Sequence, residues 1–467
     1  MRTSITCLVV LVAAMPASAR ILNVPADYPT IQAGIDASVN GDTVLVAPGE
    51  YDENPIIQDK NILLTSAEGP TNTRINGQVK IYGLSVDTTC VLRGFRIDGQ
   101  GYDQWLDNLV RIQYGSPIIW GNIIESNINY YWGAGVMLDS SMAIIRGNII
   151  RDNWSWQMGA GIAASWRSGI KEGNVVSGNH TGYLPEWGDA AGIQAGGVIR
   201  YNLIIDNAAA RIIYYATGGG LHTSGAAQVY NNTIVGNIAS GQGGHGKGGG
   251  IYFSARGPGW NGFFKNNIVA FNPRGGGVWA DIDDSAYFVW DYNLVFGNDT
   301  ADYIGIEPGP HDVHNDPLFV DRFSGDYRLL SNSPCIDVGD PTMPLDPDST
   351  RADIGAYYFD QSVGIHDDGT PSGPYDFSLR QNYPNPFNGQ TVISYYLDKQ
   401  STVSLFIFSI TGHLVLALVN KEIQEAGEHK YIWEGRDANG KAVSTGIYFY
   451  ELYVNASRES KAMIMIK

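Results

Sequence analysis

Short apolar runs, separated by bends rich in glycine and asparagine, repeat along the middle of this chain. In each unit a glycine-rich triplet opens one apolar run, a second run follows, and the phrase x-Asn-x-(Ile/Val)-x-x-Asn carries a third. The first asparagines of seven copies stand at 122, 148, 174, 202, 232, 267 and 293, so successive copies are 26, 26, 28, 30, 35 and 26 residues apart. Such a period indicates stacked units, because one unit cannot bury its apolar face alone.

The apolar runs predict strands rather than helices. One unit holds Val136-Met137-Leu138, then Ala143-Ile144-Ile145, then Ile149-Ile150, with Gly and Asn at the bends and no stretch of helical period. Three short strands per coil predict an all-β parallel β-helix, in which equivalent residues lie about 4.8 Å apart. We expect the first asparagines to form a structural ladder between coils rather than a catalytic set.

Stacking also predicts which side chains face inward and which face outward. The position after each triplet should face the bore, as at Val136 and Ile162. The next position should face solvent, and in successive coils it is occupied by Met137, Ala163, Gln194, His222, Tyr252 and Trp279.

The start of the chain predicts secretion. Residues 1–19 read as a signal peptide, with Arg2, an apolar run from Ile5 to Ala14 and the cleavage motif Ala17-Ser18-Ala19. The run is too short to span a bilayer, and no other segment is long enough, so we expect no transmembrane segment in the mature chain. Cys90 and Cys335 lie far apart in sequence, which argues against a disulfide framework.

Composition divides the rest of the chain into five parts. We expect an N-terminal cap (20–55) with a short helix in which Ile31, Ile35 and Val39 share one face, then the β-helix (56–310). A closing segment (311–360), a linker (361–375) and a small β-sandwich (376–467) follow. The aspartates of the closing segment either hold Ca²⁺ or form turns. They are Asp337, Asp340, Asp346, Asp348 and Asp353.

Two stretches near the N-terminus carry a family resemblance. Tyr28-Pro29-Thr30-Ile31-Gln32 and Gly41-Asp42-Thr43-Val44-Leu45 resemble the opening of proteins of the pectin-lyase-like superfamily, and with the coils the resemblance covers about residues 24–300. It implies a right-handed parallel β-helix. It also implies a substrate groove along the outer face of one sheet, walled by the long loops between strands.

The C-terminal module carries a second resemblance. The motifs Asn382-Tyr383-Pro384-Asn385-Pro386, Ile410-Thr411-Gly412 and Gly446-Ile447-Tyr448 are similar to the type A C-terminal sorting domain of the type IX secretion system, with Gly389 where that family usually has Pro. This resemblance implies that the type IX machinery is a partner. It further implies export across a Gram-negative outer membrane to the cell surface or the medium. An Ig-like module used as a stalk or for adhesion is the alternative.

Aromatic residues gather in the loops before the glycine triplets and on the outward positions after them. Their flat apolar faces suit the faces of sugar rings, so the sequence predicts an aromatic-lined polysaccharide cleft, although rings that only pack on one another would look the same. The candidate substrate-binding residues are Trp132, Trp154, Trp156, Tyr183, Trp187, Gln194, Arg211, Tyr215, Tyr252 and Trp279.

Candidate catalytic groups are fewer, and nothing in the sequence fixes their geometry. A lyase acting on uronates needs the substrate carboxylate neutralised and a base nearby. Asp281, Asp283 and Asp284 could ligate Ca²⁺ for the first task, and His222, Lys247 or Arg211 could be the base. A glycoside hydrolase needs two carboxyl groups, which Glu186 and Asp189 could supply. Apart from Ca²⁺, the sequence indicates no cofactor.

The formal charge of −17 limits the classes of binding partner that we expect for this chain. It argues against binding to nucleic acid or to an anionic membrane surface, and against a polyanionic glycan unless a cation bridges the two. We therefore expect a secreted, cell-surface-directed β-helix protein that binds polysaccharide and, if it is an enzyme, degrades it as a lyase or hydrolase. A non-catalytic adhesin or structural surface protein is the alternative.

Overall fold

A computed structural model describes most of the chain. The described residues are 19–99, 108–130, 132–165, 168–182, 189–210, 216–241, 246–255, 261–283, 287–361, 377–379, 382, 387–397, 399–409, 414–438, 440–443, 446–454 and 457–465. The expected signal peptide lies almost wholly outside them, and so does most of the expected linker.

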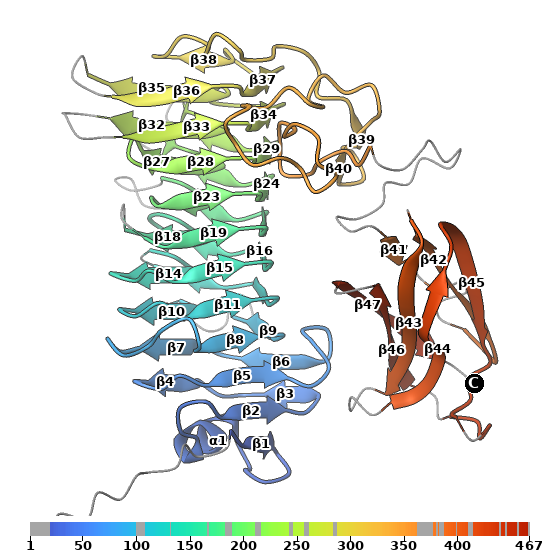
Figure 1. Ribbon diagram of the computed structural model, residues 1–467. Coiled ribbons are helices and arrows are strands. Elements are labelled where there is room, and N and C mark those ends of the chain that lie inside the picture. Colours follow the sequence, from blue (N-terminus) through green and yellow to red (C-terminus); the bar gives the residue numbers. More distant parts are fainter. Residues whose placement is uncertain are drawn as a thin grey trace, which may run out of the picture.

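The first part of the chain is a parallel β-helix, as predicted, built from three long sheets (Figure 1). Sheet A runs β1 (Ile21–Val24), β2 (Thr43–Val46), β5 (Leu63–Ser66), β8 (Val91–Arg93), β11 (Ile118–Trp120), β15 (Ile144–Arg146), β19 (Ile170–Glu172), β23 (Val198–Arg200), β28 (Gln228–Tyr230), β33 (Gly262–Lys265) and β36 (Phe288–Asp291). Sheet B runs β3 (Gly49–Tyr51), β6 (Thr73–Asn76), β9 (Arg96–Asp98), β12 (Ile123–Glu125), β16 (Ile149–Arg151), β20 (Val175–Ser177), β24 (Leu203–Ile205), β29 (Thr233–Val235), β34 (Ile268–Ala270) and β37 (Leu294–Phe296). Sheet C runs β4 (Ile56–Gln58), β7 (Val79–Tyr82), β10 (Val110–Gln113), β14 (Val136–Asp139), β18 (Ile162–Ala164), β22 (Ile193–Gln194), β27 (Leu221–Ser224), β32 (Ile251–Ala255), β35 (Val278–Ile282) and β38 (Tyr303–Ile304).

Some coils carry short strands beyond the three that the sequence predicts. Sheet D contains β13 (Ile128–Asn129), β17 (Trp154–Ser155), β21 (His180–Thr181), β25 (Ala208–Ala210) and β30 (Ile238–Ser240). A two-stranded sheet joins β26 (Ala216–Thr217) to β31 (Gly246–Lys247) just before the glycine triplets. These pairs are two or three residues long, so the apolar pattern of the sequence does not separate them from turns.

The coils stack in register, and the inward columns fill the bore. Val136 pairs with Ile162, Ile162 with Ile193 and Ile193 with Leu221, and all of these side chains are fully buried. Because each column places one apolar side chain above another, the bore forms one continuous hydrophobic core along the solenoid.

The asparagines form the expected ladder at the bend between sheets A and B. From Asn122 to Asn293, each side-chain amide donates to the Oδ1 atom of the next asparagine, at 2.9–3.1 Å. The last asparagine of each repeated phrase forms a second ladder at the far end of sheet B, from Asn153 to Asn298. Nearly all of these side chains are buried, which confirms that they are structural.

A short helix covers the N-terminal end of the bore. α1 (Ile31–Ala37) is capped by Thr30, whose side chain accepts a hydrogen bond from Ala33 N (3.1 Å). Ile31 and Ile35 are buried against the first coils, as expected. Val39 does not share their face, because the helix ends at Ala37 and leaves Val39 49% exposed.

The closing segment folds back onto the outward face of sheet B (Figure 1). It contains one hairpin, β39 (Phe319–Asp321) with β40 (Asp326–Leu329). Phe319, Leu329 and Ile354 pack on Leu203 and Ile268 in a second apolar core. Asn231 Nδ2 donates to the carbonyl oxygens of Asp353 (2.9 Å) and Gly355 (3.2 Å), which anchors the segment to the solenoid.

The C-terminal part is a small antiparallel β-sandwich with a core of its own. One sheet contains β41 (Phe377–Leu379), β42 (Thr391–Leu397) and β45 (Gly427–Trp433). The other contains β44 (Leu414–Gln424), β43 (Ser401–Ser409), β46 (Gly446–Val454) and β47 (Ser457–Met465). Side chains from both sheets, such as Ile393 and Leu405, meet in one buried cluster.

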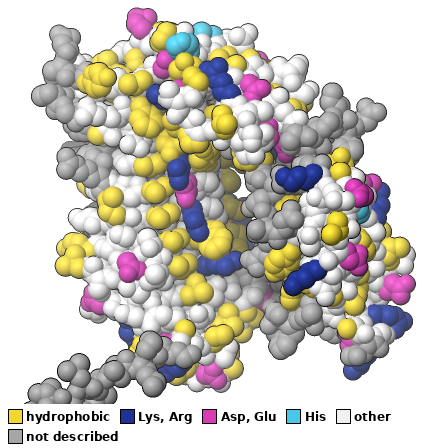
Figure 2. Space-filling model, viewed as in Figure 1, with side chains coloured by type: hydrophobic (Ala, Val, Ile, Leu, Met, Phe, Trp, Pro, Cys, Tyr) yellow, Lys and Arg dark blue, Asp and Glu magenta, His cyan; other side chains and the backbone are white. Residues whose placement is uncertain are grey.

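The outward face of sheet A carries an apolar stripe beside a row of charged side chains (Figure 2). Arg146, Glu172 and Arg200 follow one another in register, and Arg200 pairs with Glu172 (2.6 Å). Trp120 pairs in register with Arg146 at the N-terminal end of this row, and the guanidinium groups of Arg93 and Arg146 lie 4.2 and 4.9 Å from the centre of its ring. Cys90 and Cys335 are both buried and unbonded, as the sequence predicts.

Candidate functional site

The outward column of sheet C gathers most of the candidate residues that the structure describes. Gln194 in β22 pairs in register with His222 in β27. His222 pairs in turn with Tyr252 in β32, and Tyr252 pairs with Trp279 in β35. Neighbouring members are therefore one strand spacing apart, about 4.8 Å. Toward the N-terminal end the same column continues through Ala163 and Met137, and then through basic side chains at Arg111 and Lys80.

A second column flanks the first at the residue that precedes each glycine triplet. Trp132 bridges to Met158, and Met158 to Asp189, while Thr217 pairs with Lys247. Ala190 N donates to Thr217 O (2.8 Å), which joins the two halves of this column. A row of side chains therefore borders the sheet C face along one side. It begins with the aromatic Trp132 and ends with the basic Lys247.

Contacts within sheet C and between the two columns fix several of these side chains. Thr217 Oγ1 lies 3.1 Å from His222 Nδ1, and the His222 ring meets Tyr252 edge to face at 4.7 Å between centroids. Tyr252 Oη donates to Asp281 Oδ2 (3.2 Å). Lys247 Nζ lies 5.1 Å from the centre of the Trp279 ring, a cation–π distance. The face thus combines the imidazole of His222, which Thr217 orients, with the ammonium group of Lys247 and the aromatic ring of Trp279.

Packing limits how far the outward column reaches solvent. Gln194 and Tyr252 point outward, yet each is only 9% exposed. Gln194 Nε2 lies 3.4 Å from Met158 Sδ in the flanking column, and Tyr252 lies between His222 and Asp281. His222 and Trp279 remain partly exposed, so they offer the column's accessible surface.

The aromatic loop residues divide between two places. Trp132 is 45% exposed in the flanking column, and its Nε1 donates to Gln157 Oε1 (2.8 Å). Trp156 packs on Tyr130, with ring centroids 4.1 Å apart. Trp154 is different, because it lies in sheet D beside His180, at 5.8 Å between ring centroids, rather than in sheet C. Rings that pack on one another therefore account for part of the aromatic pattern.

Several predicted site residues cannot be placed. Glu186, one half of the predicted hydrolase pair, lies outside the described residues, and so does Asp284 of the predicted metal set. The same holds for the candidate binding residues Tyr183, Trp187, Arg211 and Tyr215. Asp189 is described, and its Oδ1 accepts from Thr217 N (3.2 Å).

The predicted Ca²⁺ ligands stay a prediction. Asp281 lies next to Tyr252, and Asp283 is exposed at the end of β35, where its N–H donates to Ala255 O (3.2 Å). Within the described ranges, no three His, Cys, Asp or Glu side chains are grouped so that they could hold a metal ion.

Sequence reasoning missed the partners that hold the column. Thr217 and Met158 contact His222 and Gln194, and neither was a candidate. A usable signal was present, because both residues directly precede a triplet, like Trp132 and Lys247. Reading that position down the repeats would have predicted the flanking column.

Comparisons with known proteins match two segments of the chain. Residues 190–339 match the family described as "Disaggregatase related", and residues 381–467 match the "Secretion system C-terminal sorting domain". No curated protein matches the chain.

Among solved structures, the PL6 family alginate lyase AlyGC aligns at 13% identity, over 79% of this chain and 60% of that one, with a TM-score of 0.34. Dimeric latent PorU from Porphyromonas gingivalis aligns at 20% identity, over 22% and 10% of the two chains, with a TM-score of 0.17. PorZ, a surface component of the type-IX secretion system of the same organism, aligns at 23% identity, over 19% and 11%, with a TM-score of 0.15. TM-scores this low carry no inference about the function of this chain.

The fold and the matched segments define the class. This is a parallel β-helix protein that ends in a secretion-system sorting domain, as the sequence motifs predicted. That domain indicates export through the type IX system to the cell surface or beyond it. Of the helices described, none has the length and apolar character needed to cross a membrane.

Proposed function

We propose that this protein binds a polysaccharide along the outward face of sheet C, with the glycan parallel to the solenoid axis. The register that aligns Gln194, His222, Tyr252 and Trp279 is the observation that supports this role. A polymer that runs along the axis can contact both accessible members of the column, because His222 and Trp279 lie two strand spacings apart, about 10 Å. Aromatic faces supply stacking contact, and the imidazole and ammonium groups supply hydrogen bonds.

The basic groups favour an acidic glycan as the ligand. Lys247 and His222 lie at one end of the column, and Arg111 and Lys80 lie toward the other. Arg111 pairs with Asp139 (2.7 Å). Lys247 lies beside Trp279, so a uronate ring that stacks on Trp279 would bring its carboxylate close to the Lys247 ammonium group. This local charge opposes the formal −17 of the whole chain.

Affinity electrophoresis tests binding with matched tryptophan variants. Trp279→Ala should weaken retention on polysaccharide gels about tenfold, because one aromatic contact of this kind contributes about 1–2 kcal/mol. Trp120→Ala is the control, because Trp120 lies on sheet A and is 36% exposed. Equal retention of both variants and the parent, on a gel that retards the parent, would contradict the proposal.

Lyase chemistry at the same face is the second candidate. It is favoured by His222, which Thr217 orients, and by Lys247 in the neighbouring column. A screen of the purified protein against uronate polymers, following ultraviolet absorbance of the unsaturated product with and without Ca²⁺, separates the two roles. Product formation that His222→Ala abolishes would establish a lyase, whereas retention without product would establish a binding protein or adhesin.

A further inference from the structure

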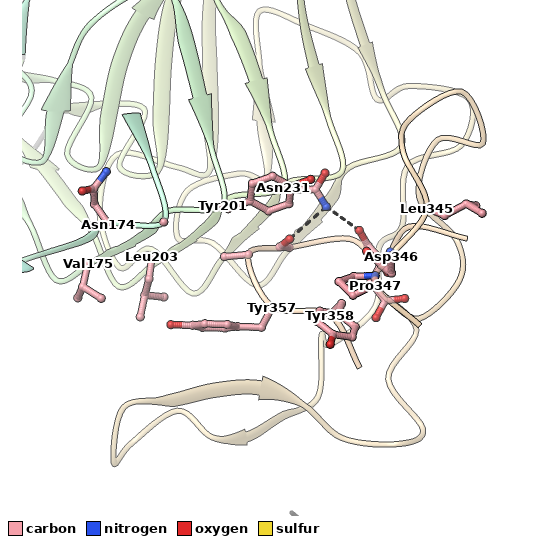
Figure 3. A pocket seen from close by; sticks show the side chains of 14 residues that line it. Asn174, Val175, Tyr201, Leu203, Asn231, Leu345, Asp346, Pro347, Tyr357 and Tyr358 are labelled. Carbon is pink, nitrogen blue, oxygen red and sulfur yellow. Dashed lines mark hydrogen bonds between the residues drawn. The ribbon is translucent and has the colours of Figure 1, made fainter. Parts of the chain in front are cut away.

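A pocket of about 430 Å³ lies between sheet B and the closing segment, where Asn231 anchors that segment (Figure 3). It is built from different sheets than the proposed polysaccharide face, and it shares none of its residues. The walls combine Val175, Leu203, Tyr201 and Asn231 of the solenoid with Leu345, Asp346, Pro347, Asp353, Tyr357 and Tyr358 of the closing segment.

Two opposed walls of the pocket are apolar. Val175 and Leu203 extend from neighbouring strands of sheet B, and in Figure 3 their side chains point toward the side where the ring of Tyr357 lies. Tyr357 is 38% exposed, so part of its side chain can be reached from solvent. An aliphatic wall opposite an aromatic ring forms a slot that suits a saturated ring.

The polar groups of the pocket are carboxylic and phenolic. Asp346 uses Oδ2 to accept from Asp353 N (2.7 Å), and in the described parts of the chain nothing donates to its Oδ1. Tyr358 Oη is buried and has no hydrogen-bond partner among the described residues. Asp353 is already satisfied, because Asp337 N and Phe359 N donate to its two oxygens at 2.7 Å. One open acceptor, Asp346 Oδ1, therefore remains for a ligand, whereas the buried Tyr358 Oη is closed to it.

Charge excludes an anionic ligand. No Lys, Arg or His lines the pocket among the residues described. Burial raises the pKa of Asp346 to about 6 and that of Asp353 to about 7, and the nearby Asp337 adds to both shifts. The pocket therefore offers an anion no positive charge, and each of these carboxyl groups repels a uronate or a sulfate once it is ionised.

We propose that this pocket binds a single uncharged sugar ring. The ring packs between Tyr357 and the aliphatic wall of Val175 and Leu203, while a ring hydroxyl donates to Asp346 Oδ1. A pocket of this size, with apolar walls and a few placed polar groups, is typical of small-ligand sites. It differs from the sheet C face, whose basic groups suit an acidic polymer.

Saturation-transfer NMR on the full chain tests this site, with D-glucose, D-galactose and D-mannose as probes and D-glucuronate and D-glucosamine as charged comparisons. At least one neutral hexose should show transfer from the parent protein, and glucuronate should show none. Tyr357→Ala should abolish the signal. Tyr287→Ala, an exposed tyrosine outside the pocket lining, and Trp279→Ala, on the sheet C face, should leave it unchanged.

Asp346→Asn separates a ligand-binding role from a structural one. The amide can still accept from Asp353 N through one oxygen, but it offers no acceptor toward the ligand. Sugar affinity should fall about tenfold, as expected for a lost hydrogen bond to a charged group. The unfolding temperature should rise, because a buried like charge is removed. Absence of transfer from every neutral hexose, stronger transfer from glucosamine or glucuronate, or retained binding in Tyr357→Ala would overturn the proposal.

Discussion

Each buried asparagine at the bend between sheets A and B serves three coils at once. Asn174 Nδ2 donates to Ile145 O (2.8 Å) and Asn202 Oδ1 (2.9 Å). Its own Oδ1 accepts from the backbone and the side chain of Asn148, at 3.0 and 3.1 Å. One side chain therefore satisfies polar groups that no water can reach.

Asn174→Ala should lower the free energy of unfolding by about 3 kcal/mol, because it leaves several buried donors and acceptors without partners. Denaturant-induced unfolding, followed by circular dichroism, measures the change. Asn332→Ala is the control, since Asn332 is exposed in the closing segment. Equal midpoints for the two variants would show that the ladder does not stabilise the solenoid.

Lys171 is an exception to the apolar bore. It pairs in register with Ile145 and Ile199, is fully buried, and donates to Ser168 Oγ and Gly196 O. Burial lowers the pKa of its ammonium group to about 7. The charged form is therefore disfavoured in the folded protein, and this cost is full below pH 7 and disappears as the pH approaches the unfolded value near 10.5.

Lys171→Met should stabilise the protein by about 1–3 kcal/mol at pH 6, because an apolar side chain of similar volume replaces a buried charge. Ser168 Oγ and Gly196 O are left bonded to each other at 3.3 Å. The gain in unfolding free energy should become smaller as the pH rises from 7 to 10. Unfolding midpoints of parent and variant across that range measure it, and a gain independent of pH would refute the assignment to the ammonium charge.

At the scale of elements, both asparagine ladders end on an aspartate. Asn293 N donates to Asp312 Oδ1 (2.8 Å), and Asn298 donates to Asp302 Oδ1 from its backbone (3.0 Å) and its side chain (2.7 Å). Asp312 Oδ2 also accepts from Trp290 Nε1, Tyr303 Oη and Gly309 N. A carboxylate suits this position because the ladder ends on unsatisfied donors.

Asp312→Ala should loosen the last coils without unfolding the first ones, since each coil of a solenoid depends on its neighbours. Hydrogen exchange should speed up in β36–β38 and stay unchanged in β14–β16. The exposed Glu307 provides the control variant Glu307→Ala. Uniform loss of protection along the whole solenoid would contradict a local cap.

The repeat period made the elements predictable, because one register determines which side chain lies above which. The inward column after each triplet, the asparagine ladder and the outward column of sheet C all follow from it. Lys171 was not predictable from that pattern, since it occupies a slot that is apolar in the neighbouring coils. The closing segment was not predictable either. Its contacts join residues 74 to 124 positions apart with no repeat to align them, as in Asp340 with Asn266 and Gly355 with Asn231.

The candidate site was predictable only where it follows the column. Gln194, His222, Tyr252 and Trp279 came from register alone. Trp154 belongs to a different sheet, because loop residues do not carry the period that places strand residues. The orientation of His222 by Thr217 depends on side-chain geometry, which a single sequence does not contain.

At the scale of the whole molecule, the solenoid stacks the candidate binding residues along one axis, and the sorting domain directs export through the type IX system. The accessible part of the column, from His222 to Trp279, spans two strand spacings, about 10 Å. A glycan bound along it gains contacts only until it covers that length. The dependence of affinity on chain length therefore reports directly on the stacked column.

Calorimetric titration of the purified protein with uronate oligosaccharides of increasing length is the most direct test. We expect affinity to rise with length until the oligosaccharide spans the column and then to level off. In Trp279→Ala the plateau should come at a shorter length and a lower affinity, while Trp120→Ala should match the parent. Affinity that is the same for the shortest and longest oligosaccharides, or that Trp279→Ala leaves unchanged, would contradict the account.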